Sequence, residues 1–163
     1  MNLEKPNSDG GFRSMEQQEP IRIVWEKILS KFPDQLQEEF RDERPNPNQE
    51  DIEQFGSFRL LASDPVSIPL GELLKNNEGN IFSSPPDIIK EINEKWGTRF
   101  DVSLSKVYDQ NPDRLRRYSL MSSETACPSV MVDGEILFGV GRFIAALLRK
   151  DKDLKVWKLS RKQ

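Results

Sequence analysis

The sequence of 163 residues contains no histidine. Histidine is the commonest general base and the commonest metal ligand. Its absence therefore excludes Ser-His-Asp and Cys-His catalysis and every histidine-containing zinc site. Any chemistry must use carboxylates, arginine, lysine, hydroxyl groups or the single cysteine, Cys127.

Cysteine and long apolar runs are also scarce. One cysteine cannot form an internal disulfide, which is typical of a protein from a reducing cytoplasm. No stretch approaches the roughly 18 apolar residues of a membrane span, and residues 1–14 lack the apolar core of a secretory signal. We therefore expect a cytoplasmic protein with no membrane insertion.

The net charge of −3 is unevenly spread along the chain. Residues 1–100 carry 12 basic and 19 acidic side chains, whereas residues 101–163 carry 12 basic and 8 acidic ones. The basic C-terminal part is the candidate for binding phosphate or DNA. The acidic N-terminal part is the candidate for binding a basic protein partner.

The first hundred residues divide into two predicted parts. Residues 1–19 are polar and rich in turn-forming residues, which predicts a flexible tail. Residues 20–99 are predicted to be mostly helical and to pack on the domain that follows. Helices are expected over 21–32, 34–40, 50–55 and 84–96, and a short strand over 57–62. In the last helix we expect Ser84 as the N-cap and Gly97 just past the end.

The apolar face around Trp25 has two interpretations. A tryptophan-centred face at helical spacing is most often part of a core. Alternatively, this face and the acidic residues Glu38, Glu39 and Asp42 would dock a protein partner.

Residues 100–160 are predicted to form a compact α+β domain. Alternation over 100–107 predicts a strand, and Asn111-Pro112 would cap a helix over 113–123. Strands over 129–132 and 135–138 flank Asp133-Gly134, a dipeptide typical of a type I′ hairpin turn. A helix after Gly139 and a strand over 153–159 complete the domain.

Gly139, Gly141 and Arg142 form a candidate phosphate site at a strand-to-helix junction. Glycines allow a ligand to approach the backbone closely, and a helix N-terminus offers N–H groups and a positive dipole end. An arginine adds a planar charged group suited to phosphate. The alternative is a tight turn followed by a surface arginine.

Arg114, Arg116 and Arg117 lie on one predicted helical turn. Such a group is usually a solvated face, but it would also serve to contact the phosphates of DNA.

The order of elements resembles the ParB/sulfiredoxin superfamily. The matching features are a strand over 102–107, Asn111-Pro112, a proline-bearing strand over 128–132, and Gly139, Arg142 and Ala145 in the G-x-R-R-x-x-A type of box. Gly141 replaces the first arginine of that box. Sulfiredoxins carry a cysteine at this junction and this chain does not, so sulfinic-acid reduction is not expected.

This resemblance implies a nucleotide, ATP or another NTP, bound with Mg²⁺ over the glycine–arginine box. Superfamily members hydrolyse nucleoside triphosphates, phosphorylate small substrates or cut DNA. In an ATPase or nuclease of this kind, Asp133 and Glu135 would bind the metal or orient water, and Glu124 would be a third catalytic carboxylate. Small members on conjugative plasmids include the Osa-type fertility inhibitors, which act against transfer of another element.

Three other interpretations stay open. Residues 125–147 are also similar to the C-terminal half of a glutaredoxin, in which Pro128 would follow a cis peptide bond, but no CxxC site is present. The protein could be a non-catalytic inhibitor that binds a partner through its acidic N-terminal part. It could also be a simple DNA-binding protein whose affinity falls steeply with salt.

Overall fold

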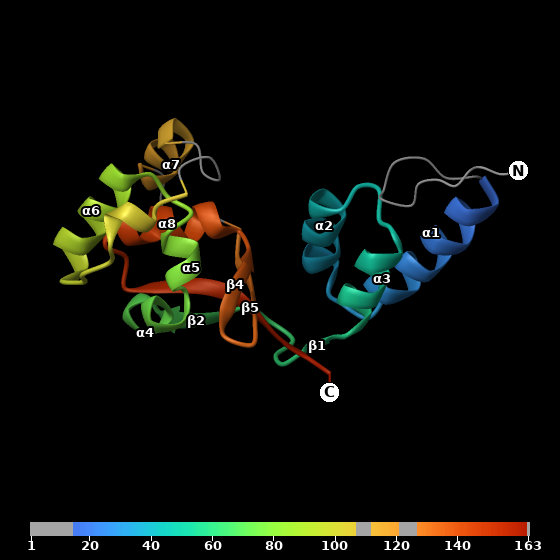
Figure 1. The fold of residues 1–163 in the computed structure, drawn as a ribbon. Coiled ribbons are helices and arrows are strands. Elements are labelled where there is room, and N and C mark those ends of the chain that lie inside the picture. The colour runs from blue at the N-terminus through green and yellow to red at the C-terminus, as the bar shows by residue number, and fades with distance from the viewer. Residues whose placement is uncertain (1–14, 107–111, 121–126, 163) are drawn as a thin grey trace, which may run out of the picture. The chain divides into compact units, whose positions relative to one another are not determined.

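The computed structural model describes residues 15–106, 112–120 and 127–162 (Figure 1). The chain divides into two compact units. Unit 1 comprises residues 1–59 and 161–163, and unit 2 comprises residues 60–160. The boundary predicted at residue 100 is therefore displaced. Residues 60–99 belong to unit 2 because their helices share one core with the C-terminal strands.

The described residues of unit 1 form the helices α1 (Met15–Leu29), α2 (Asp34–Glu43) and α3 (Gln49–Gly56). All three were predicted from the sequence. Helix α1 begins earlier than expected, so residues 15–19 are helical and do not belong to a flexible tail. Pro20 consequently lies inside the helix and not at its start. The rest of the predicted tail, residues 1–14, lies outside the described residues.

Aromatic rings make up much of the core of unit 1. Phe55 packs edge-on against Trp25 and Phe40, with ring centroids 5.0 and 4.9 Å apart, respectively. Phe32 meets Phe40 in the same way at 5.3 Å. Such edge-to-face pairs stabilise a core beyond the area they bury. Trp25 is only 2% exposed, so its face is core, and the interpretation of that face as a docking surface is wrong.

The turn between α2 and α3 is fixed by polar contacts. Asn48 and Asp51 form a capping box, in which each side chain accepts a hydrogen bond from the other residue's backbone N–H. Arg44 pairs with Asp51 at 3.0 Å and lies over the Phe55 ring. These contacts join the end of α2 to the start of α3.

Unit 2 is built on a mixed sheet. Its strands are β2 (Val66–Pro69), β3 (Ser129–Val132), β4 (Glu135–Phe138) and β5 (Asp153–Arg161), whereas β1 (Phe58–Leu60) begins in unit 1. Within unit 2 the order is β5-β3-β4, and β2 also pairs with β5. Strand β3 runs parallel to β5, with Val130 opposite Trp157, and antiparallel to β4. The α+β class predicted from the sequence is confirmed.

The helices of unit 2 are α4 (Leu70–Asn76), α5 (Glu78–Ile81), α6 (Pro86–Trp96), α7 (Pro112–Ser119) and α8 (Val140–Arg149). One face of the sheet presents Met131, Ile136, Leu154 and Val156 to a core shared with α4, α6 and α8. Residues 143–148 of α8 are all buried, so this helix is central to unit 2.

Two local predictions are wrong. Residues 100–106 form no strand and contain a short 3₁₀ helix (Val102–Leu104), because Asp101 accepts hydrogen bonds from the backbone N–H and hydroxyl of Ser103. These bonds hold the pKa of Asp101 below its usual range. Ser84 does not cap α6; Pro85 occupies the N-cap and the Ser84 side chain is buried.

Other local predictions are confirmed. Gly97 ends α6 in the left-handed conformation, with φ of +65°. The hairpin strands and the last strand form where expected. Helix α7 ends at Ser119, earlier than predicted. Asn111 and residues 121–123 of that prediction lie outside the described part of the chain.

The far ends of α6 and α8 are tied together. The Lys95 ammonium and the Trp96 indole N–H donate to the carbonyls of Leu148 and Leu147, respectively. The Lys150 ammonium in turn donates to the Lys95 carbonyl and lies 4.0 Å from the centre of the Trp96 ring. Carbonyls at a helix C-terminus lack partners within the helix and favour cations. Each helix therefore caps the other.

Two asparagines hold the outer strand β4 against the helices. The buried Asn77 side chain accepts from the Ile136 N–H at 2.7 Å and donates to the Gly134 carbonyl at 3.2 Å. Asn80 donates to the Ile136 carbonyl at 2.9 Å. The amides take the place of a neighbouring strand, so the edge of the sheet keeps its backbone groups bonded.

Replacing Asn77 by Ala should lower the free energy of unfolding by about 2–4 kcal/mol, because the buried N–H of residue 136 and the half-buried carbonyl of residue 134 lose their partners. Chemical denaturation measures the change. Asn76→Ala is the matched control, since Asn76 is the exposed neighbour of Asn77. Equal effects of the two substitutions would contradict the bridging role of Asn77.

Candidate functional site

The hairpin that leads to the candidate site has the predicted turn. Asp133 and Gly134 both have positive φ, +52° and +88°, as a type I′ turn requires. The backbone N–H of Asp133 donates to the Leu159 carbonyl at 3.0 Å, which fixes the turn to the end of β5. The hairpin thereby sets the direction in which β4 enters α8.

Gly139 is the N-cap of α8 and adopts the left-handed conformation, with φ of +80°. It has no side chain to cap the helix, so the first N–H groups of α8 receive no side-chain hydrogen bond from the N-cap. Gly141 lies in the first turn of the same helix. The two glycines therefore occupy the strand-to-helix junction that the sequence predicted.

Arg142 folds back across this junction. Its Nη1 donates to the carbonyls of Cys127 and Pro128, at 3.1 and 2.7 Å, respectively. A Cβ atom on Gly139 would lie 2.9 Å from Cζ of Arg142 and 2.7 Å from Oγ of Ser129. The guanidinium thus packs directly on Gly139, in a space that any other residue would fill.

Ser129 completes the junction from the neighbouring strand. Its buried hydroxyl donates to the Gly139 carbonyl at 2.9 Å, and the same carbonyl accepts the first intrahelical bond from the Phe143 N–H. This residue was not among the predicted site residues. Only the pairing of β3 with β4 brings it beside Gly139, so no local spacing in the sequence identifies it.

The predicted catalytic carboxylates are not brought to this junction. Asp133 and Glu135 are exposed at the turn end of β4, whereas Gly139 follows the other end. At a rise of about 3.3 Å per residue, Glu135 lies about 13 Å along the strand from Gly139. Glu124 lies outside the described residues. Among the residues that are described, no three His, Cys, Asp or Glu side chains are grouped as a metal site would require.

One of the three arginines of α7 is engaged within the fold. Arg116 pairs with Glu91 at 2.6 Å and with Asp87 at 3.7 Å, both on α6. Arg117 is exposed, and the side chain of Arg114 is not described. Arg116 therefore holds α7 against α6, so one of the three arginines predicted to contact DNA already has partners within the fold.

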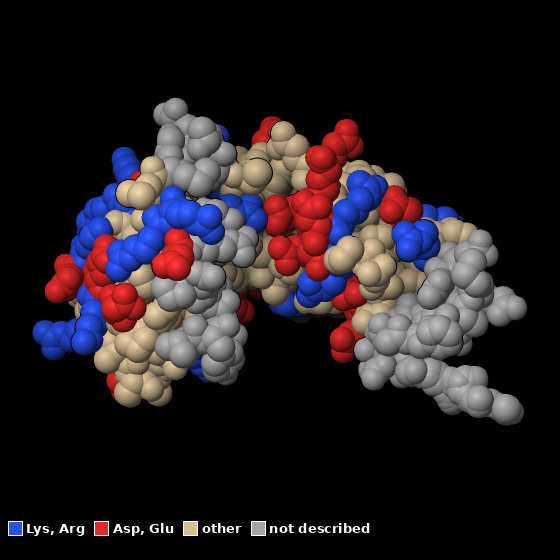
Figure 2. Space-filling model, turned by 90° about the horizontal axis from the view of Figure 1, so that it is seen from above, with Lys and Arg blue, Asp and Glu red and all other residues tan. Residues whose placement is uncertain are grey.

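The balance of charge between the two parts of the chain changes when the boundary is placed at residue 60. Unit 2 contains 14 basic and 14 acidic residues, and unit 1 contains 10 basic and 13 acidic ones. Unit 2 is therefore neutral overall, which weakens the electrostatic argument for DNA binding. Figure 2 shows acidic side chains gathered over α2, where Asp34, Glu38 and Asp42 are exposed at intervals of one helical turn. A basic protein partner for this face stays a prediction.

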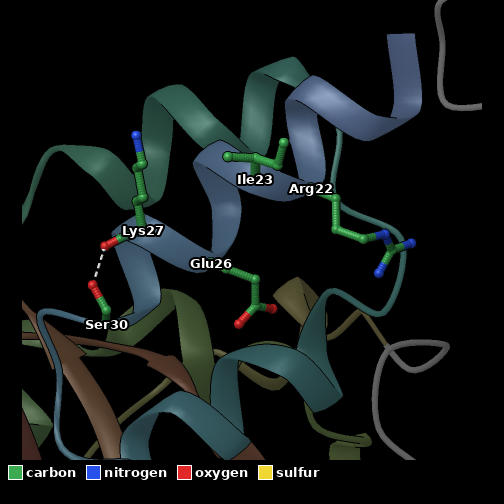
Figure 3. A pocket seen from close by; sticks show the side chains of 5 residues that line it. All are labelled: Arg22, Ile23, Glu26, Lys27 and Ser30. Atoms are coloured by element: carbon green, nitrogen blue, oxygen red, sulfur yellow. Dashed lines mark hydrogen bonds between the residues drawn. The ribbon is translucent and has the colours of Figure 1, made fainter. Parts of the chain in front are cut away.

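A shallow hollow of about 380 Å³ lies along the exposed side of α1. Figure 3 shows the side chains that line it, which are those of Arg22, Ile23, Glu26, Lys27 and Ser30. The one carboxylate among them, that of Glu26, already forms an ion pair with Arg41 at 2.8 Å. The hollow brings together no set of groups suited to catalysis.

The structure also bears on two other sequence-based predictions. No described residue follows a cis peptide bond, so the glutaredoxin-like prediction for Pro128 is wrong. Over residues 15–106, 112–120 and 127–162, every helix is too short or too polar to cross a membrane.

Comparison with protein-family models, with curated proteins and with solved structures finds no match to this chain.

Replacing Gly139 by Ala should destabilise unit 2 by about 1–2 kcal/mol from the left-handed backbone alone, and by more because the new methyl group meets Ser129 and Arg142. Thermal or chemical denaturation measures the loss. Gly71→Ala is the matched control: this glycine lies within α4 with open space around it, and the substitution should be neutral or stabilise by up to about 1 kcal/mol. A destabilisation at Gly71 as large as that at Gly139 would contradict this account.

The ion pairs of Glu91 predict a dependence of stability on pH. Burial raises the pKa of Glu91, but hydrogen bonds from Arg116 and Lys95 outweigh it and lower the pKa below the ordinary value of 4.5. A lowered carboxyl pKa stabilises the fold above pH 4.5, and this stabilisation is lost as the pH falls through the folded-state pKa.

Unfolding followed between about pH 6 and about pH 3 should therefore show that Glu91→Gln destabilises the protein at the higher pH and has progressively less effect at the lower pH. Glu94→Gln, an exposed position on the same helix, is the control. A destabilisation by Glu91→Gln that does not change with pH would rule out the ionic contribution.

Proposed function

We propose that unit 2 is a phosphate-binding module that holds a nucleoside triphosphate at the N-terminus of α8. One observation carries the proposal: α8 begins at a left-handed glycine with no capping side chain, and a guanidinium lies directly on that glycine. Helix N-termini bind anions through their backbone N–H groups and dipole. An arginine at the same place adds charge-assisted hydrogen bonds.

Two further features support a phosphate ligand here. Gly139 has no Cβ atom, which lets the Arg142 guanidinium lie directly against the backbone at the start of α8. The bond from Ser129 to the Gly139 carbonyl holds the junction in place before any ligand arrives, which lowers the entropy that binding must overcome. The resemblance to the ParB/sulfiredoxin superfamily, in which the corresponding box binds a nucleotide, agrees with this proposal.

The proposal stops at binding. A Mg²⁺ ion that bridges nucleotide phosphates needs carboxylate or other oxygen ligands close to those phosphates. Asp133 and Glu135 lie at the opposite end of β4 from Gly139, so they do not fit a metal at the proposed phosphate position. We therefore derive no hydrolytic or nuclease step from these residues.

The strand over 102–107 that the resemblance required is replaced by the 3₁₀ helix at Val102–Leu104. A different strand opens unit 2, since β2 (Val66–Pro69) pairs with β5 and leads directly into α4. The ParB/sulfiredoxin proposal therefore rests on β3, β4, α8 and β5. A role against transfer of another genetic element, as in the Osa-type inhibitors, belongs to the same proposal.

The proposal predicts that ATP or CTP binds in isothermal titration calorimetry, with and without Mg²⁺. Arg142→Ala should weaken binding roughly tenfold to hundredfold, the effect of losing hydrogen bonds from a charged group. Lys155→Ala, which removes an exposed positive charge from β5, should leave the affinity unchanged.

Circular dichroism and a melting curve establish that each variant is folded before titration. If the unaltered protein binds neither nucleotide, or if Arg142→Ala binds as tightly as the unaltered protein, the phosphate site is disproved. Equal losses in Arg142→Ala and Lys155→Ala would indicate only a general effect of charge.

A further inference from the structure

We draw no further inference here: the strongest candidate, the exposed apolar hollow around Ile23 on α1, carries none, because nothing in the described part of the chain shows what covers it.

Discussion

The parallel pairing of β3 with β5 is the constraint on which unit 2 depends. Parallel neighbours cannot be joined by a tight turn and need a crossover, usually through a helix. Here the crossover is the hairpin strand β4 followed by α8, and the helix buries residues 143–148. Because β4 and α8 follow one another directly, the chain must turn sharply at Gly139. The candidate phosphate site is the place of that turn.

Polar contacts hold this arrangement where apolar packing alone would not fix it. Asn77 and Asn80 satisfy the outer backbone groups of β4, and Ser129 ties β3 to Gly139. Lys95 and Trp96 cap the far end of α8. Together these contacts position both ends of α8 and the strand before it, and all but the Ser129–Gly139 bond join segments more than 50 residues apart. Asn77 and Ser129, which are buried, specify one arrangement, because leaving buried polar groups unbonded is costly.

Arg142 is central to the proposed function. Its bonds to the carbonyls of Cys127 and Pro128 place the guanidinium on Gly139, where a phosphate would bind. The neutral charge of unit 2 agrees with a site for one small anion more than with a surface for a nucleic acid.

The sequence by itself determined the features that depend on neighbouring residues. Asp133-Gly134 predicted the hairpin turn, Gly97 the end of α6, and the apolar spacing most helices, because turns, caps and amphipathic faces are local. The missing histidine also limited the chemistry. Only the tertiary structure decided which residues meet across the fold. It placed Ser129 beside Gly139 and engaged Arg116 in an ion pair with Glu91. It also separated Glu135 from the junction and moved the boundary between the units to residue 60. The physical reason is that strand pairing and core packing join segments that no local pattern relates.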